Sequence, residues 1–187
     1  MRIIAGAFRG RRLASVGKGD AGAHLRPTSD RVRESLFNVL THMDVLEGAI
    51  VLDLFAGTGA LGREALSRGA DHVSFVEKGR VGQALIRENI QITGSADQTR
   101  LIARDAMRLG RAERAASLVF LDPPYGKSMG EKAIEAARAG GWIAPGALIV
   151  WEEDAPVEPP DGFTLADHRT YGGTHITCMR FANEDGV

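Results

Sequence analysis

Residues 49–62, which read AIVLDLFAGTGALG, decide the fold of this chain. A continuous apolar run leads directly into a glycine-rich turn, and a helical pattern follows it. An unbroken apolar run of this kind is typical of a strand buried on both faces of a parallel sheet. Glycines let the turn bend sharply and let a ligand approach the backbone without a Cβ in the way. The stretch therefore predicts an open α/β sheet with a ligand site after this strand.

The same rhythm of strand, turn and helix continues on both sides of this stretch. We expect helices near 29–42, from the glycine turn to about residue 68, near 79–93 and over 130–139. We expect strands at 49–54, 72–77, 99–103, 117–121 and 147–151. Residues 163–170 and 174–181 flank Tyr171-Gly172-Gly173, which predicts an antiparallel hairpin. The fold class is α/β: a Rossmann-like class I methyltransferase fold, with a seven-stranded mixed sheet, helices on both faces and an antiparallel C-terminal hairpin.

Length and composition predict one domain. The chain has 187 residues, 44% of them hydrophobic and 25% charged, which suits a single globular domain over 1–187. We divide it into a basic N-terminal arm, residues 1–24, and a catalytic core, residues 25–187. Loose alternation in residues 1–13, with Gly6 and Gly10, predicts a short β-hairpin in the arm. The single cysteine and the lack of a long apolar run predict a cytoplasmic protein.

Charge is unevenly distributed along the chain. The formal net charge is −1, but residues 1–40 carry eight Lys or Arg against three acids. Such asymmetry predicts a polyanionic partner for the N-terminal end. A solvated basic hairpin without a partner explains the charge equally well.

Acidic residues at strand ends predict how a cofactor is held. Glu77 follows the second strand, where its carboxylate could accept both ribose hydroxyls of NAD or of S-adenosylmethionine. Asp53 lies four positions before Gly57, which suits the cationic amino-acid end of S-adenosylmethionine better than a pyrophosphate. Asp105, unless it is simply an exposed loop acid, is placed to accept from the adenine amino group. The remaining predicted cofactor-binding residues are their neighbours: Phe55, Ala56, Thr58, Gly59, Lys78 and Ala106.

Asp122-Pro123-Pro124-Tyr125, after the fourth strand, is the most specific motif in the chain. An exocyclic amine on a nucleobase is a poor nucleophile because its lone pair is delocalised into the ring. Asp122 and the carbonyl of Pro123 can accept its two N–H groups and so orient that lone pair, and proline holds its carbonyl in place. Tyr125 offers a ring on which the base can stack. A proline turn capping a strand would explain the prolines, but not the flanking acid and aromatic residue. We predict that Asp122, Pro123, Pro124 and Tyr125 are the catalytic segment.

With these residues, the chain resembles the bacterial 16S ribosomal RNA guanine-N2 methyltransferase family, RsmD-like, over nearly its whole length. The segments that carry the resemblance are residues 2–6 (RIIAG), 9–13 (RGRRL), 26–28 (RPT), 31–38 (RVRESLFN), 52–59 (LDLFAGTG), 67–70 (SRGA) and 122–125 (DPPY). The glycine turn within 52–59 and the tetrapeptide 122–125 are shared by many amino-methyltransferases. The two N-terminal segments, 2–13 and 26–38, are the part specific to this family.

The resemblance implies S-adenosylmethionine as methyl donor, no metal, and one guanine of 16S ribosomal RNA as acceptor. It implies a substrate that is an assembling or assembled small ribosomal subunit, and we expect the enzyme to be a monomer. The arm and the first helix would then contact RNA phosphates, which position the RNA without reading its sequence. The predicted RNA-binding residues are Arg9, Arg11, Arg12, Arg26, Arg31 and Arg33.

Four other functions remain open on the sequence. An adenine-N6 or cytosine-N4 methyltransferase can use the same tetrapeptide, but usually carries an additional domain. A protein glutamine methyltransferase normally has Asn in place of Asp122. An NAD-dependent dehydrogenase leaves the tetrapeptide unexplained. A non-catalytic RNA-binding assembly factor on the same fold is the alternative outside the enzyme class.

Several other residues favour structural roles. The five histidines form no spacing typical of a metal site. Cys178 falls among apolar residues of a predicted strand, which favours a buried thiol. Trp142 and Trp151 are expected to pack against the sheet.

Overall fold

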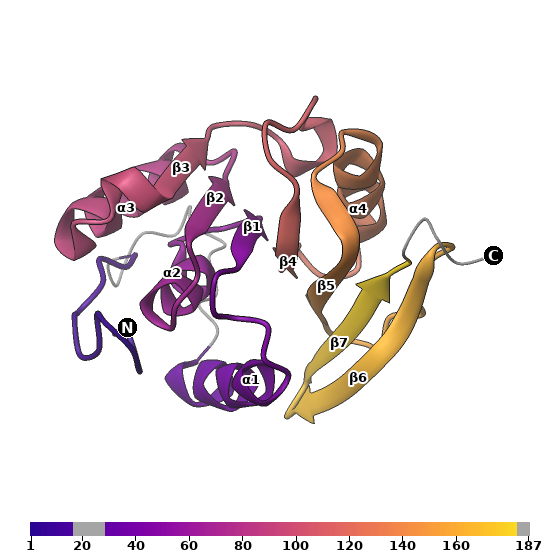
Figure 1. The fold of residues 1–187 in the computed structure, drawn as a ribbon, viewed down its shortest axis with the longest axis horizontal. Coiled ribbons are helices and arrows are strands. Elements are labelled where there is room, and N and C mark those ends of the chain that lie inside the picture. Colours follow the sequence, from indigo (N-terminus) through magenta and orange to yellow (C-terminus); the bar gives the residue numbers. More distant parts are fainter. Residues whose placement is uncertain (17–28, 183–187) are drawn as a thin grey trace.

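The computed structural model describes residues 1–16 and 29–182 (Figure 1). The described residues form a seven-stranded sheet in the order β3-β2-β1-β4-β5-β7-β6. Its strands are β1 Ile50–Leu54, β2 His72–Val76, β3 Thr99–Ile102, β4 Ala116–Leu121, β5 Ile143–Glu153, β6 Phe163–Tyr171 and β7 Thr174–Phe181. The first five strands are parallel, and β7 runs antiparallel between β5 and β6. The predicted mixed sheet with an antiparallel C-terminal hairpin is confirmed.

Helices cover both faces of the sheet, as predicted. They are α1 Asp30–His42, α2 Ala60–Ser67, α3 Arg80–Thr93 and α4 Met129–Ala139, with the short 3₁₀ helices η1 Ala96–Gln98 and η2 Ala106–Arg108. One core cluster packs α1, α2 and α3 against one face of the sheet, and a second packs α4 and η2 against the other. Two local signals set where helices begin. The Ser29 side chain caps α1 by accepting from the Val32 N–H, and the N-cap of α2 is Gly59, whose φ of 75° favours glycine.

Strand β5 is longer than the sequence predicts, because it begins at Ile143 rather than near residue 147. The prediction stopped short of Pro145 and Gly146, which weaken a strand interior. In the structure these two residues fall where the pairing with β4 is irregular, between Ala116 opposite Ile143 and Leu118 opposite Leu148. An irregularity of this kind relieves the residues inside it of regular ladder hydrogen bonds.

The N-terminal segment, residues 1–16, folds back on itself as the hairpin that the sequence predicts, but without two continuous strands. It closes on itself through a single antiparallel bridge between Arg2 and Arg12. Backbone bonds cross the turn from Ile3 N–H to Arg11 O (3.0 Å) and from Gly10 N–H to Ile3 O (2.9 Å). The turn also bonds to α2: Ala7 N–H donates to Ser67 O (2.7 Å) and Phe8 N–H to Ser67 Oγ (2.9 Å). Gly6 has a φ of 82°, and a Cβ there would lie 1.7 Å from Ser67 O. The segment therefore packs tightly on α2, beside which it lies in Figure 1.

The register of the sheet brings the ends of the parallel strands together. Leu54 pairs with both Val76 and Leu121, and Leu121 pairs in turn with Trp151. The residues that follow β1, β2, β3, β4 and β5 therefore emerge at one edge, which we call the carboxyl edge. Open α/β sheets bind their ligands at this edge. No helix among residues 1–16 and 29–182 is long and apolar enough to cross a lipid bilayer.

Candidate active site

The carboxyl edge brings together most of the predicted site residues. The turn from Phe55 to Gly59 leaves β1, Glu77 leaves β2, Asp105 lies three residues beyond β3, and Asp122 leaves β4. Because β1 lies between β2 and β4, its glycine turn has Glu77 on one side and the Asp122 segment on the other. The residues predicted to bind the cofactor and those predicted to be catalytic thus lie at one edge of the sheet.

Asp53 lies below this turn and is almost fully buried, with 2% of its surface exposed. Its Oδ2 accepts from the N–H of Gly62, at the start of α2, at 3.0 Å. The pKa of Asp53 is raised to about 7, mainly by burial; Glu77 contributes to the rise, whereas the Gly62 N–H and Arg63 oppose it. Asp53 is the residue predicted to meet the cationic amino-acid end of S-adenosylmethionine. In this structure one of its carboxylate oxygens anchors α2, the helix that follows the glycine turn.

The backbone of the glycine turn is closely packed against the strands beside it. Gly57 and Gly59 both have positive φ, and Gly59 N–H donates to Ala56 O at 2.7 Å. A Cβ on Gly62 would lie 2.6 Å from side-chain carbons of Phe75 and Val73. Phe55, at the start of the turn, also has a positive φ of 59°, an uncommon conformation for a residue with a side chain. Strain of this kind is found at ligand sites, where the surrounding structure supports it.

Glu77 spans the turn and the start of α3. Its Oε2 accepts from Gly57 N–H at 2.8 Å, and its Oε1 accepts from Gly79 N–H at 2.5 Å. Gly82 makes room for this carboxylate, since a Cβ there would lie 2.8 Å from Glu77 Cδ and 2.9 Å from Gly57 O. The carboxylate is held at the end of β2, where a ribose would meet it.

Asp105 and Lys78 form an ion pair of 2.9 Å beside Glu77. Asp105 also caps η2 by accepting from Met107 N–H at 3.0 Å, and the Lys78 contact is the main reason that its pKa is lowered. Ala106 is buried at the start of η2. Asp105 is therefore a negatively charged acceptor at the rim of the site rather than a free loop acid.

Asp122 lies at the end of β4 in an acidic setting. Desolvation raises its pKa well above the ordinary value, and Glu152, Asp53 and Glu153 raise it further. Groups of the same charge that share a site disfavour ionisation, so an N–H donor placed beside Asp122 would stabilise its charged form. Of the two prolines that follow, Pro123 is buried and Pro124 is exposed.

Tyr125 is fixed by a residue that the sequence interpretation missed. Its hydroxyl donates to Oε1 of Glu152, on β5, at 2.8 Å. Burial and Glu152 together raise the pKa of Tyr125. Glu152 follows the apolar run 147–151 as Glu77 follows β2, so the same criterion of an acid at a strand end would have found it.

The predicted RNA-binding arginines separate into two groups. Arg9, Arg11, Arg12 and Arg31 are exposed. Arg33 is fully buried, and the prediction that it contacts RNA is wrong. Its Nη2 donates to Arg2 O (2.5 Å) and Asp30 Oδ1 (3.0 Å), and its Nε lies 3.8 Å from the buried carboxylate of Glu64. It faces inward because helical spacing places it on the same side of α1 as Leu36, Phe37 and Leu40. Arg26 lies outside the described residues.

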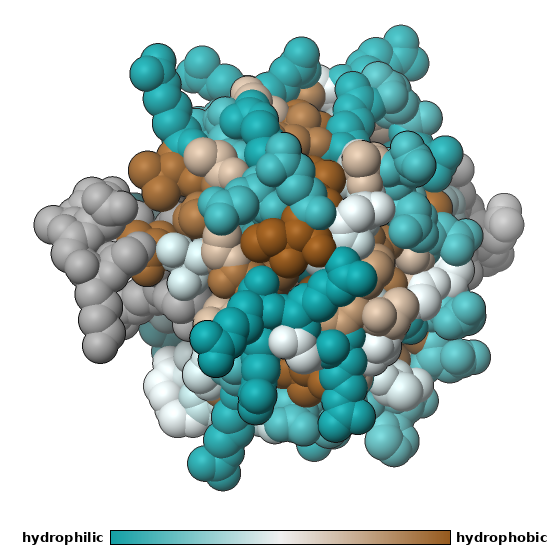
Figure 2. Space-filling model, turned by 90° about the vertical axis from the view of Figure 1, so that its left-hand side faces the viewer, coloured by the Kyte–Doolittle hydropathy of each residue, from teal (hydrophilic) through white to brown (hydrophobic). Residues whose placement is uncertain are grey.

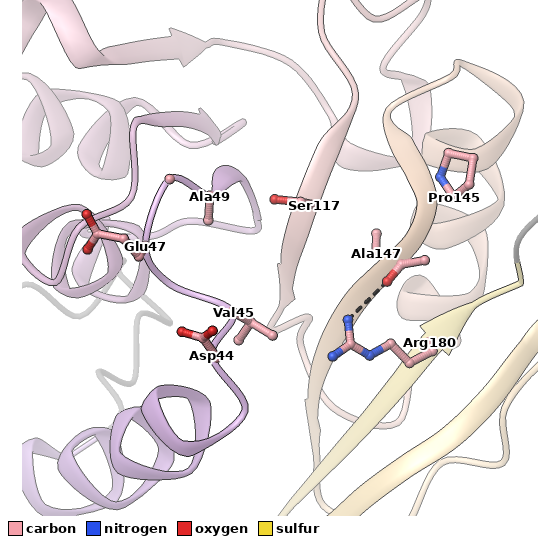
Figure 3. Close-up of a pocket in the computed structure, with 10 residues that line it drawn as sticks. Asp44, Val45, Glu47, Ala49, Ser117, Pro145, Ala147 and Arg180 are labelled. Atoms are coloured by element: carbon pink, nitrogen blue, oxygen red, sulfur yellow. Dashed lines mark hydrogen bonds between the residues drawn. The ribbon is translucent and has the colours of Figure 1, made fainter.

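The hollows of the surface lie away from this edge. One of about 250 Å³ is at the opposite ends of the strands, between Asp44, Glu47, Ser117 and Arg180, where Arg180 donates to Gly146 O at 3.0 Å (Figure 3). A second of about 260 Å³ includes His72, whose pKa is lowered by desolvation and then by Arg114 and Arg100. Neither hollow contains a predicted site residue.

The residues assigned structural roles lie in the core. Trp142 and Trp151 are 6% and 1% exposed, and Cys178 is 1% exposed with its pKa raised by burial to about 12. Within the two described ranges, no three His, Cys, Asp or Glu side chains gather as metal ligands.

The chain is similar to known proteins over nearly its whole length. A protein-family model described as "Conserved hypothetical protein 95" matches residues 1–180. Ribosomal RNA small subunit methyltransferase D of Haemophilus influenzae is 38% identical over 178 residues, covering 92% of this chain and 89% of that protein. The protein of the same name from Escherichia coli K12 is 41% identical over 156 residues, covering 82% and 75%. Among solved structures, the putative methyltransferase yhhF from Escherichia coli has a TM-score of 0.83 at 34% identity, covering 98% and 99%. These matches confirm the family resemblance inferred from the sequence.

Proposed function

The chain belongs to the family described as "Conserved hypothetical protein 95", and we propose that it uses S-adenosylmethionine to methylate the N2 amino group of a guanine in 16S ribosomal RNA. The observation that carries this proposal is the pairing of β1 with β4, which places the glycine turn next to Asp122. A methyl donor held by the turn and an amino group held by Asp122 would meet at one edge. Two relatives whose printed name is ribosomal RNA small subunit methyltransferase D support ribosomal RNA as the substrate class.

The residues at the edge fit an adenosine-containing methyl donor. A Cβ on Gly62 or Gly82 would collide with neighbouring atoms, and Gly59 has a positive φ, so the turn and the starts of α2 and α3 pack closely together. Glu77 would hold the ribose hydroxyls, and Asp105 would lie near the adenine. Residues 55–59 and Asp53 would line the amino-acid end. When bound, S-adenosylmethionine supplies an electrophilic methyl group on a sulfonium.

Asp122 supplies the acceptor side of the reaction. Its carboxylate and the carbonyl of Pro123 would accept the two N–H bonds of the guanine amine and direct the nitrogen lone pair toward the methyl. Because methyl transfer needs alignment more than proton chemistry, orientation can account for about 7–11 kcal/mol of the barrier. The nitrogen forms a bond to carbon, the carbon–sulfur bond breaks, and one N–H proton is lost. A raised pKa suits Asp122 to take that proton.

The face that carries α3 and the N-terminal segment supports an RNA partner. Figure 2 shows this face covered mostly by hydrophilic side chains around a small hydrophobic area. Arg9, Arg11 and Arg12 are exposed on the segment and would contact phosphates. The target guanine would leave its stack to reach Tyr125, which costs least in a loop or an unpaired stretch.

The decisive experiment is methyl transfer to small ribosomal subunits from a strain that lacks this protein, with the modified nucleotide mapped. We expect one N2-methylguanine in 16S ribosomal RNA. Adenine or cytosine as the acceptor would refute the guanine assignment, and no transfer with intact cofactor binding would favour a non-catalytic assembly factor.

A variant of the catalytic segment tests the mechanism in the same assay. Asp122→Ala should reduce turnover by at least 100-fold, in the range of losses that follow removal of a positioned acid–base group. Binding of S-adenosylhomocysteine, measured by calorimetry, should change little. Collapse of that binding would make Asp122 a structural residue and contradict its assigned role.

A further inference from the structure

A buried amide on α3 joins the N-terminal segment to the glycine turn. Asn89 is fully buried, and its side chain makes three hydrogen bonds to backbone. Its Oδ1 accepts from Ala14 N–H at 2.7 Å, and its Nδ2 donates to Ala14 O at 3.2 Å and to Thr58 O at 3.1 Å. One side chain therefore satisfies groups in both segments, although they lie far apart in the sequence.

The contact at Thr58 fixes a peptide of the predicted cofactor turn. The carbonyl of Thr58 and the N–H of Gly59 belong to the same planar unit. Asn89 holds the carbonyl, and Ala56 O accepts from the N–H at 2.7 Å. Both the carbonyl and the N–H of this peptide are therefore hydrogen-bonded, directly before α2, whose N-cap is Gly59. A second link runs from the Thr58 hydroxyl to Met1 Sδ at 3.8 Å.

Other contacts attach the segment to the core without reaching the turn. Glu64 Oε2 and Oε1 accept from Ile4 N–H (2.9 Å) and Ala5 N–H (3.0 Å). Ser67 Oγ donates to Ala5 O at 2.5 Å and accepts from Phe8 N–H at 2.9 Å. Both residues lie on α2. Ser67 therefore offers a matched comparison with Asn89, because it holds the same segment but has no contact with Thr58 among these bonds.

We propose that Asn89 is a positioning residue that couples RNA binding by the N-terminal segment to cofactor binding by the glycine turn. The inference rests on the proposed function. If the N-terminal segment shifts, the buried amide of Asn89 loses its hydrogen bonds to Ala14, which is costly for a buried polar group. The amide is then no longer held in the position from which it bonds to Thr58 in the glycine turn. Ordering of the segment and ordering of the turn therefore favour each other. Coupling between two sites is reciprocal: a cofactor analogue must tighten RNA binding by the factor by which RNA tightens the analogue.

The first test measures this factor in solution. Small ribosomal subunits that lack the modification are bound to the full chain in a filter assay, with and without saturating S-adenosylhomocysteine. We expect the analogue to tighten binding about five- to tenfold for the unaltered chain, within the usual range of coupling. Asn89→Ala should bring the factor close to one. Ser67→Ala should weaken subunit binding and keep the factor. Equal factors in all three proteins would overturn the proposal.

The second test needs no variant and so does not depend on the folding of Asn89→Ala. Amide hydrogen exchange is measured on the unaltered chain with and without S-adenosylhomocysteine. The Ala14 amide, which donates to Asn89, should exchange several-fold more slowly with the analogue bound. Unchanged exchange at Ala14 in a chain shown by calorimetry to bind the analogue would overturn the coupling alone. Failure of the analogue to bind at all would overturn the proposed function and the coupling together.

Discussion

The hydroxyl of Tyr125 donates to Glu152 Oε1 at 2.8 Å, so the residue after the two prolines is tied to the end of the neighbouring strand β5. The contact joins the loop after β4 to a second element and limits where the aromatic ring can lie. A ring held in one place is ready to stack on a base that enters beside Asp122, because ordering it at the moment of binding costs nothing further.

Removing this hydroxyl should therefore slow catalysis without affecting the cofactor. Tyr125→Phe keeps the ring and loses the bond to Glu152, and we expect kcat to fall roughly tenfold, since a hydrogen bond to a charged group contributes about 1.5–3 kcal/mol. Steady-state methylation of small subunits measures the effect. The control is Tyr171→Phe, at the chain's other tyrosine. Equal kcat for Tyr125→Phe and the unaltered chain would show that Glu152 does not position the ring.

The sequence predicted those parts of the fold and site that depend on local pattern. Apolar runs that end in glycine or in an acid predicted β1, β2 and β4. Because parallel strands finish at one edge, the acids that follow these strands, Glu77 and Asp122, could be predicted to lie at that edge. What it missed depends on contacts between distant residues. Helical spacing puts Arg33 on the apolar side of α1, but its buried partner Glu64 is 31 positions away, and Asn89 pairs with Ala14, 75 positions away. A charged or amide side chain in a helix gives no local sign that such a partner exists.

The buried position of Arg33 predicts a loss of stability on substitution rather than a loss of RNA contact. In Arg33→Met the carboxylate of Glu64 keeps its bond from Arg68 but loses a buried cation, and breaking a buried pair costs about 3–5 kcal/mol. Urea unfolding should show this decrease in the free energy of unfolding. Arg31→Met, at an exposed position of the same helix, is the matched control and should change it by less than about 0.5 kcal/mol. Equal stability of the two variants would contradict the burial of Arg33.

Asp53 predicts a specific dependence of stability on pH. Its pKa is about 7 in the folded chain and 3.8 in the reference state, so the folded chain holds the proton more tightly than the unfolded chain does. The free energy of unfolding contributed by this group is therefore greatest below pH 4, decreases as the pH rises through 4 to 7, and is level above that. The total decrease is at most about 4 kcal/mol.

The isosteric variant Asp53→Asn removes this titration and retains an oxygen for Gly62 N–H. We expect it to gain stability relative to the unaltered chain between pH 4.5 and pH 7.5, as measured by urea unfolding at several pH values. Asp122 titrates with the same sign, and because Asp53 raises its pKa, the substitution also lowers the pKa of Asp122. That change reduces the loss of stability with rising pH, so it adds to the expected gain and does not reverse it. Asp97→Asn, at an exposed position, is the control and should show no such gain. A difference between Asp53→Asn and the unaltered chain that does not change with pH would refute the raised pKa.

The exposed arginines of the N-terminal segment predict how RNA binding depends on salt. Arg9, Arg11 and Arg12 are exposed, although Arg11 also donates to Ile92 O at 2.7 Å. If each contacts one phosphate, changing all three to Gln should reduce the magnitude of the slope of log K against log salt concentration by about 2–3, since each contact contributes roughly 0.7–0.9. Binding of small subunits at four or more salt concentrations measures this slope.

A matched triple variant separates local contact from overall charge. Arg100, Arg114 and Arg138 are exposed on other parts of the chain, and changing them to Gln removes the same number of charges. The slope of log K against log salt concentration for this control variant should stay close to that of the unaltered chain if phosphates contact the N-terminal segment. The same reduction in both triple variants would mean that net charge, and not this segment, governs the attraction. A reduction only in the control variant would place the RNA on the opposite end of the sheet.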